Sequence, residues 1–173
     1  MLAYIALLRA VNVGGTGKLP MAELVEVGKS IGLTDPRTYI QSGNLLFRSD
    51  EAEDVLRSRI EGALKDQTGL NTSVFIRTTD EMRAVVEANP FPQAAPNQLM
   101  VLFLAEAISG DPLDGAKGHK DEQIQAIGRE IYIHFPSGAG KSRLKLAAMD
   151  GVQGGTMRNL NTVRKLVELH GEA

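Results

Sequence analysis

The chain has no cysteine in its 173 residues. Without this residue it cannot form a disulfide framework, a thiolate nucleophile, a zinc ribbon or an iron–sulfur site. The three histidines are far apart in the sequence and form no H-x-H or H-E-x-x-H motif, so no metal site is predicted and no cofactor is expected. The carboxylates form no pair that we can assign to general acid–base chemistry, so no catalytic residue is predicted.

Long apolar runs are also absent. The longest, at residues 3–8 and 99–105, are far shorter than the roughly 20 residues that a membrane span needs. The N-terminus lacks a basic region followed by a cleavage site. We therefore expect a cytoplasmic protein that has no membrane partner.

Aromatic residues make up only 5% of the chain, and the net charge is −2. Neither value indicates a general nucleic-acid-binding protein. The aromatic signature of RNA-recognition modules is missing, so Tyr4 and Phe47 are predicted to be core residues. Residues 136–165 carry six basic side chains and one acidic one, which solvated helix surfaces explain more simply than a dedicated polyanion surface.

The first half of the chain predicts an α+β fold. Apolar periodicity, turn residues and helix-start signals define its elements. These are a strand at 4–8, a helix starting at Pro20 and ending at Gly32, a hairpin of strands 37–41 and 45–48, a helix capped by Ser49 or Asp50 and ending at Gly69, and a strand at 74–77. This order of strand, helix, strand, strand, helix and strand is typical of the ferredoxin-like, split βαβ sandwich.

The second half predicts a smaller α/β unit. Thr78 and Glu81 form a capping-box pair that opens a third helix, and the proline-rich residues 89–97 suggest a boundary between domains 1–90 and 91–173. A strand at 99–105, a hairpin around Gly128 and Arg129, and helices at 141–149 and 159–170 then follow. We interpret this as a partial βαββα copy of the first half with an extra helix and no closing strand, although no sequence repeat supports a duplication.

A glycine loop follows the first predicted strand. Gly14 and Gly15 lie in it, and Arg9, Asn12 and Lys18 lie beside it. Successive backbone amides in such a loop can bind an anion. The loop is therefore the first candidate ligand site.

Residues 137–142 have the context of a P-loop between a strand and a helix. The spacing fails, because the leading glycine of G-x-x-x-x-G-K-[ST] falls at Phe135, so an ATPase or GTPase is not predicted. The amides of residues 138–141, with Lys141 and Ser142, could still bind one phosphate or sulfate. A glycine-rich turn that caps a helix is the simpler interpretation.

Two further polar segments are difficult to explain by packing alone. One contains Gln41, Ser42 and Asn44, and the other contains Arg158, Asn159 and Asn161. Asparagines often form turns and helix caps, which could account for about half of these residues.

Four segments of the chain together resemble a known family. They are LLRAVNVGGTGKLPM, TYIQSGNLLF, IHFPSGAGKSRL and RNLNTV, and the resemblance is to the bacterial family called domain of unknown function 1697. It implies an α/β fold of ferredoxin-like type in a bacterial cytosolic protein, and it implies no activity. The matching positions are Arg9, Asn12, Gly14, Gly15, Gln41, Ser42, Gly43, Asn44, Arg158, Asn159 and Asn161. The chain departs from the family pattern at Ala10, where glycine is usual, and at Leu160, where an aromatic residue is usual.

Three functional hypotheses follow. The first is a binding protein that gathers the glycine loop and the two polar segments around an anionic or polar ligand, such as a phosphate-bearing nucleotide or RNA. The second is a metal-independent small-molecule enzyme, with Ser42, Ser142 and His134 as the residues to test. The third is a protein interaction module in which the polar side chains bind one another. The sequence predicts no oligomeric state.

Overall fold

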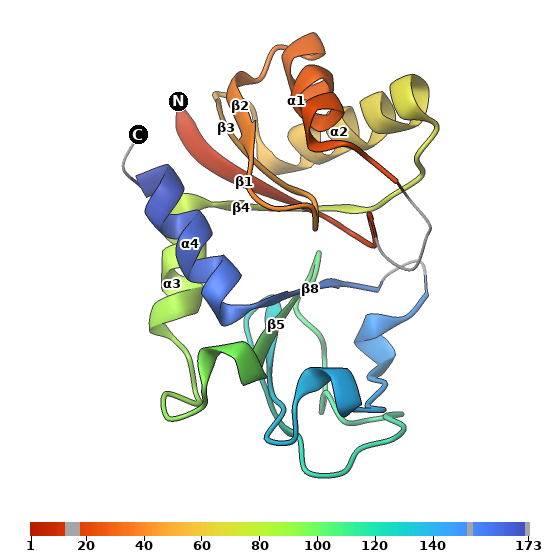
Figure 1. Cartoon of the computed structure of the whole chain (residues 1–173), viewed down its shortest axis with the longest axis vertical. Coiled ribbons are helices and arrows are strands. Elements are labelled where there is room, and N and C mark those ends of the chain that lie inside the picture. Colours follow the sequence, from red (N-terminus) through yellow and green to blue (C-terminus); the bar gives the residue numbers. More distant parts are fainter. Residues whose placement is uncertain (13–17, 152–153, 172–173) are drawn as a thin grey trace. The chain divides into compact units, whose positions relative to one another are not determined.

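The computed structural model describes residues 1–12, 18–151 and 154–171. The chain forms two compact units: unit 1 comprises Met1–Met82 with Leu166–Ala173, and unit 2 comprises Arg83–Lys165. Each unit contains a four-stranded antiparallel sheet (Figure 1), which confirms the α+β class. The division into domains 1–90 and 91–173 stays a prediction.

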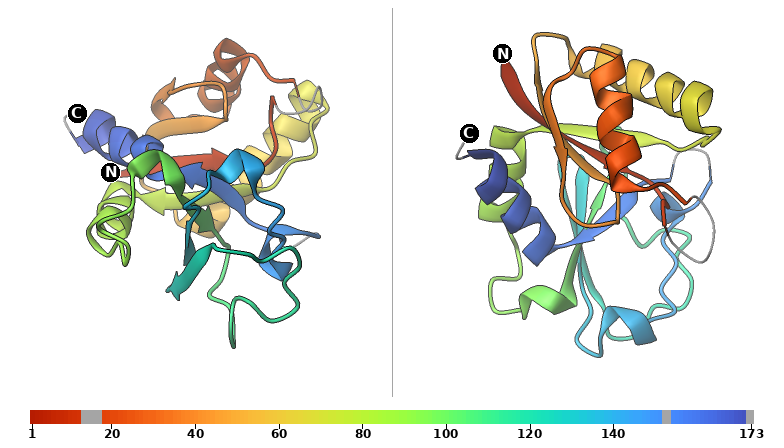
Figure 2. Two further views of the ribbon diagram at one scale, coloured as in Figure 1. Left: turned by 60° about the horizontal axis from the view of Figure 1, so that its bottom comes forward. Right: turned by 45° about the horizontal axis from the view of Figure 1, so that its top comes forward.

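Unit 1 has the predicted order of strands and helices. The elements are β1 (Leu2–Leu8), α1 (Met21–Ser30), β2 (Thr34–Thr38), β3 (Asn44–Ser49), α2 (Glu53–Thr68) and β4 (Val74–Thr78). The strands lie in the order β2-β3-β1-β4, and each neighbouring pair is antiparallel. Helices α1 and α2 cover the same face of this sheet (Figure 2).

The core of unit 1 follows from two periodicities. Alternate residues of β1 point to the helix side, where they meet residues at helical spacing on α1 and α2. The buried set from these elements is Tyr4, Ala6, Leu8, Leu24, Val27, Leu56, Ile60, Ala63 and Leu64. The apolar stripe of α2 is therefore buried, whereas the neighbouring Val55 is 45% exposed.

The predicted C-terminal ends of both helices are confirmed. At the end of α1 the Leu33 amide donates to the Gly28 carbonyl and the Gly32 amide donates to the Lys29 carbonyl, each at 3.1 Å, which is a Schellman cap. Helix α2 ends at Gly69 in the left-handed conformation.

The predicted start of α2 is wrong. Its N-cap is Ala52, with no side-chain cap, and the Ser49 hydroxyl instead accepts the Glu51 amide at 3.0 Å. The serine stabilises the turn that precedes the helix.

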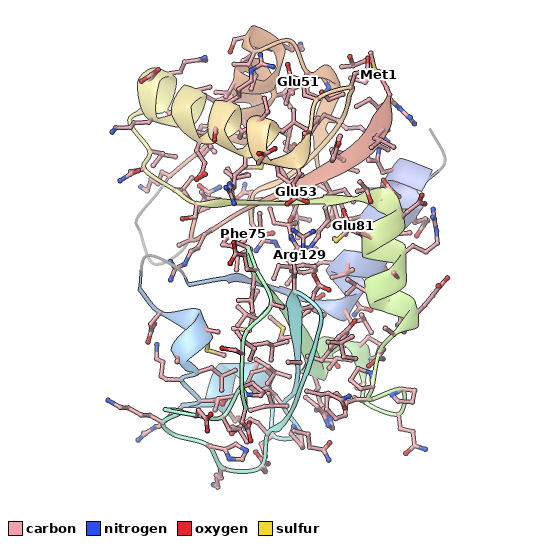
Figure 3. All side chains as sticks on the ribbon, turned by 180° about the vertical axis from the view of Figure 1, so that it is seen from behind. Met1, Glu51, Glu53, Phe75, Glu81 and Arg129 are labelled. Atoms are coloured by element: carbon pink, nitrogen blue, oxygen red, sulfur yellow. The ribbon has the colours of Figure 1, made fainter. Side chains whose placement is uncertain are left out.

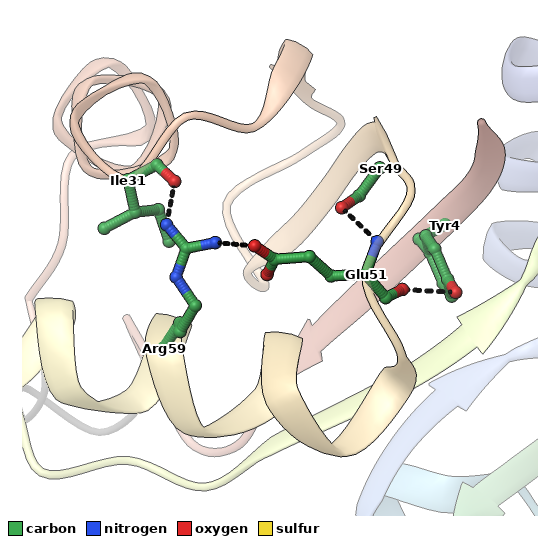
Figure 4. A network of polar contacts seen from close by, with 5 residues as sticks. All are labelled: Tyr4, Ile31, Ser49, Glu51 and Arg59. Carbon is green, nitrogen blue, oxygen red and sulfur yellow. Dashed lines mark hydrogen bonds and ion pairs between the residues drawn. The ribbon is translucent and has the colours of Figure 1, made fainter.

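A polar network joins the end of α1 to the start of α2 (Figure 4). The Arg59 guanidinium lies 2.5 Å from the Glu51 carboxylate and also donates to the Ile31 carbonyl. The Tyr4 hydroxyl donates to the Glu51 carbonyl at 2.9 Å. Because a carbonyl at a helix C-terminus has no partner within the helix, Arg59 supplies one from the neighbouring helix.

The last turn of the C-terminal helix α4 (Leu160–Gly171) belongs to unit 1. Arg37 donates to the Leu169 carbonyl at 2.6 Å. The side chain of His170 is buried, and its Nε2 lies 2.8 Å from the Phe47 carbonyl oxygen. Its Nδ1 lies 3.4 Å from the Arg37 guanidinium. A carbonyl can only accept, so Nε2 carries the proton and Nδ1 is the acceptor.

We expect unit 1 to lose stability when the pH falls below about 6.5, the ordinary pKa of histidine. Burial lowers the pKa of His170, the hydrogen bond to Phe47 partly opposes this, and the charges of Arg37 and Arg48 lower the pKa further. The unfolded chain therefore takes up a proton at a higher pH than the folded chain does, and acid favours unfolding.

Urea unfolding at about pH 7.5 and about pH 5.5 measures this effect of His170. His170→Gln keeps an N–H donor for the Phe47 carbonyl but cannot titrate. The variant should therefore lose less stability than the wild type over this range. Equal losses would show that His170 is not responsible.

Unit 2 differs from its prediction in two places. Its elements are the end of α3 (Thr79–Glu87), η1 (Pro96–Gln98), β5 (Leu99–Phe103), β6 (Gln123–Ile127), β7 (Glu130–His134), η2 (Ala139–Lys141), η3 (Ala147–Met149), β8 (Thr156–Asn159) and the start of α4. The sheet order is β6-β7-β5-β8, so a closing strand does exist. The prediction that this half lacks one is wrong.

The predicted helix at 141–149 is also wrong. Only two short 3₁₀ turns, η2 and η3, form there, and Lys145 between them makes a β-bridge with Lys117. Leu144 and Leu146 are buried while Arg143 and Lys145 are exposed. This alternation has a period of two, which is typical of extended chain.

The predicted N-terminal signal of α3 is confirmed. Thr78 and Glu81 form the capping box of α3: the Glu81 amide donates to the Thr78 hydroxyl at 3.1 Å, and the Thr78 amide donates to the Glu81 carboxylate at 2.9 Å. Figure 3 labels Glu81 on the first turn of this helix. Asn159 caps α4 by accepting the Thr162 amide at 2.8 Å.

The two sheets have the same arrangement of strands. In each unit the first strand lies between the third and the fourth, and the fourth strand carries a buried arginine. Arg77 of β4 lies opposite Ile5 of β1, and Arg158 of β8 lies opposite Val101 of β5. Both arginines are buried. In the part of the chain that the structure describes, no helix has the length and apolar character needed to cross a membrane.

Candidate functional site

Two of the predicted polar segments meet in unit 1. The Asn12 side-chain amide donates to the Leu19 carbonyl at 2.9 Å and to the Gln41 carbonyl at 2.8 Å, and its oxygen accepts the Leu19 amide at 2.8 Å. Asn12 thus joins both ends of the glycine loop to the β2–β3 turn. The loop glycines Gly14 and Gly15 lie outside the described residues.

Asn44 holds the β2–β3 turn from inside. It is fully buried, and its amide donates to the Tyr39 carbonyl and to the Ser42 hydroxyl, both at 2.9 Å. The Leu8 amide donates to the Gly43 carbonyl at 2.9 Å, which fixes the turn to β1. The side-chain amide of Asn44 therefore stabilises the turn and is turned away from solvent.

The remaining predicted residues of unit 1 are Arg9, Lys18 and Gln41. Arg9 is half-buried, and its backbone amide donates to the Ser73 carbonyl at 3.0 Å. Lys18 and Gln41 are exposed. Ala10 has a φ of 55°, a left-handed conformation that glycine adopts at lower cost.

The third predicted segment lies in unit 2. Arg158 is buried in β8 and donates to the Thr156 hydroxyl and to the Met157 carbonyl, both at 2.8 Å. Burial lowers the pKa of Arg158 to about 10, so the guanidinium stays protonated at neutral pH. Asn159 is the cap of α4, and Asn161 is exposed on its first turn.

Lys141 and Ser142, the remaining predicted residues, line a cavity of about 540 Å³ within unit 2. We call this cavity the basic pocket. Its charged and hydroxyl-bearing lining residues are Lys120, Lys141, Arg143, Ser137, Ser142, Asp121 and Glu122. The three cationic residues are exposed, so their charged groups can reach a ligand from solvent.

Protein donors already bind the two carboxylates of the basic pocket. The buried Glu122 accepts the Lys120 amide at 2.9 Å and the Ser142 hydroxyl at 3.1 Å. Asp121 accepts the Ser137 hydroxyl at 2.6 Å. The carboxylates therefore order the walls of the pocket, and the cations are the groups best placed to meet an anion.

The helix predicted to begin after the P-loop-like residues 137–142 does not form. In its place, η2 is a 3₁₀ turn of three residues. The Gly138 amide donates to the Phe135 carbonyl at 2.9 Å. Among the described residues, no group of three or more histidines, aspartates or glutamates is placed to hold a metal ion. Binding in the basic pocket would therefore depend on side-chain cations.

The sequence did not identify two cations of this pocket as ligand residues. Lys120 ends a polar segment without periodicity, and Arg143 lies in the stretch predicted to be a helix. The close approach of the two segments explains their proximity: the Gly118 α-carbon faces the Arg143 carbonyl so closely that a Cβ would lie 2.1 Å from its oxygen. No spacing rule within one segment reveals this contact.

The three comparisons with known proteins give one family and one fold. A family model described as "Protein of unknown function (DUF1697)" matches residues 1–132. The conserved bacterial protein SP0830 from Streptococcus pneumoniae has a similar structure, with a TM-score of 0.72 at 23% sequence identity. The match covers 97% of this chain and 98% of that one, and it shows the fold alone. No curated protein matches the sequence.

Proposed function

The chain belongs to the DUF1697 family of proteins of unknown function, and we propose that it binds a phosphate-bearing ligand in the basic pocket. The observation that carries the proposal is the convergence of Lys120, Lys141 and Arg143 on one cavity of about 540 Å³. A cavity of this size falls within the range of small-molecule sites.

The charges of the pocket favour an anion. Charge-assisted hydrogen bonds from lysine and arginine to phosphate are about twice as strong as neutral ones, and arginine can bind two phosphate oxygens at once. Asp121 and Glu122 would repel an anion, but each accepts hydrogen bonds from protein groups. The exposed cations place their charge toward solvent, where salt would screen part of the attraction.

Isothermal titration with inorganic pyrophosphate tests the proposal. We expect the double variant Lys141→Ala, Arg143→Ala to bind pyrophosphate about tenfold or more weakly than the wild type, because two charged hydrogen-bond donors are lost. Both side chains are exposed, so the fold should be retained.

Lys145→Ala is the matched control. Lys145 is an exposed cation two residues beyond Arg143 and does not line the pocket. It should leave the affinity for pyrophosphate nearly unchanged. An equal loss in both variants would indicate only a general charge effect, and no binding by the wild type would refute the proposal.

A further inference from the structure

Unit 2 contains a second cavity, of about 700 Å³, beside the proline-rich segment. We call it the proline pocket. Prolines and alanines line it, together with the rings of Phe91 and His134 and the amides of Gln93, Gln98 and Gln123. None of the described residues that line it carries a formal charge, which makes it unlike the basic pocket.

The proline pocket has two neighbouring rings in its lining. The Phe91 and His134 rings lie with their centroids 6.1 Å apart and their planes tilted by 35°. Aromatic and imidazole rings beside a polar rim favour a flat, uncharged ring as the occupant, because such a ring gains stacking without bringing a charge into the pocket.

Two of the residues that line this pocket form a hydrogen-bonded pair. His134 Nδ1 is 2.8 Å from the Gln123 side-chain oxygen, which can only accept, so Nδ1 carries the proton. His134 Nε2 is then an acceptor, and the Gln123 NH₂ group is a donor. Every nucleobase carries both acceptors and donors on its edges, so either group of this pair can form a hydrogen bond with a base.

Both pockets are lined by residues at the open end of the β6–β7 hairpin. Gln123 and His134 form its last paired residues, and both line the proline pocket. The next residues along each strand, Glu122 and Phe135, line the basic pocket. Since successive side chains of a strand point to opposite faces, these residues lie on opposite faces of the hairpin end, and a ligand that occupies both pockets would pass over this end.

We infer that the ligand is a nucleotide unit, either free or in single-stranded RNA, with its base in the proline pocket and its phosphate in the basic pocket. The inference rests on the proposed function, because the basic pocket must bind the phosphate. It adds the chemical class of the rest of the ligand.

Titration of the full chain with inorganic phosphate, AMP and hexa-adenylate RNA tests the inference. We expect AMP to bind about tenfold or more tightly than phosphate, since stacking and edge contacts add to the phosphate contacts. Gln123→Ala should remove most of this gain and leave the affinity for phosphate unchanged. Gln125→Ala, an exposed glutamine of the same strand outside the pocket, should behave like the wild type.

The outcomes separate the two proposals. If phosphate binds but AMP binds no more tightly, or if a proline-rich peptide occupies the proline pocket instead, the inference is wrong and the proposed function stands. If neither phosphate nor AMP binds, the proposed function fails and the inference fails with it. Tighter binding of hexa-adenylate than of AMP, lost in Gln123→Ala, identifies RNA as the source of the nucleotide unit.

Discussion

Replacing Gly43 with alanine is expected to lower the free energy of unfolding by about 2–4 kcal/mol. Gly43 has a φ of +85°, and an alanine Cβ there would lie 2.5 Å from Val11 Cγ2 and 3.0 Å from Leu8 Cβ. The left-handed backbone alone costs about 1 kcal/mol for a residue with a Cβ, and the overlap with a packed core costs about 1–3 kcal/mol more. The two costs should add, because neither Val11 nor Leu8 is exposed and free to move aside.

Gly69→Ala separates these two costs. Gly69 has a similar φ of +77°, but an added Cβ would meet nothing within 4 Å. Its variant should therefore lose only about 1 kcal/mol. Urea unfolding followed by circular dichroism measures both variants, and equal losses would contradict the close packing of the β2–β3 turn against β1.

The sequence could predict the elements of unit 1 because their periodicities agree with their burial. Residues 4–8 form an apolar run and lie in the buried centre of the sheet, and the stripe of α2 repeats at helical spacing. The helix ends could also be predicted, because Gly32 and Gly69 end α1 and α2 in the left-handed conformation that glycine favours.

Strand β8 could not be predicted because its buried positions are polar. Thr156 and Arg158 point into the interior, so the strand has no apolar alternation to detect. The Arg158 guanidinium is stabilised there by the Thr156 hydroxyl and by the Met157 carbonyl, contacts that no pattern along the chain reveals.

The prediction of a helix at 141–149 is wrong for a different reason. Its leucines, Leu144 and Leu146, alternate with cations, but the whole segment is also rich in residues that favour helices. In the folded chain the alternation prevails, because the buried leucines pack with Ile131 and Ile133 of the sheet. The same alternation turns Arg143 outward to the basic pocket. The wrong helix prediction and the failure to identify Arg143 as a ligand residue therefore have one cause.

The candidate ligand residues divide according to what their polar atoms bind. Asn44 and Asn159 use their side chains on backbone groups of a turn and of a helix start. Lys141 instead lines the basic pocket and is exposed to solvent. An asparagine in a turn looks the same in a sequence whether it binds a ligand or the backbone, so only the contacts in the folded chain distinguish the two roles.

Asn12 provides the strongest test of whether a candidate residue binds the backbone or a ligand. Asn12→Asp is expected to lower the free energy of unfolding by about 2–3 kcal/mol. The aspartate can still accept the Leu19 amide, but it replaces the NH₂ group that donates to the Leu19 and Gln41 carbonyls. A carboxylate oxygen would then face two carbonyl oxygens, and both hydrogen bonds would become repulsive contacts.

Asn71→Asp makes the same chemical change at an exposed position and should alter stability by no more than about 0.5 kcal/mol. Urea unfolding compares the two variants, and pyrophosphate titration of the folded proteins then separates the roles of Asn12. If Asn12 only joins the ends of the glycine loop to the β2–β3 turn, Asn12→Asp should lose stability and keep the wild-type affinity, because Asn12 does not line the basic pocket. A loss of affinity with unchanged stability would instead make Asn12 a ligand residue and would move the binding site to the glycine loop of unit 1.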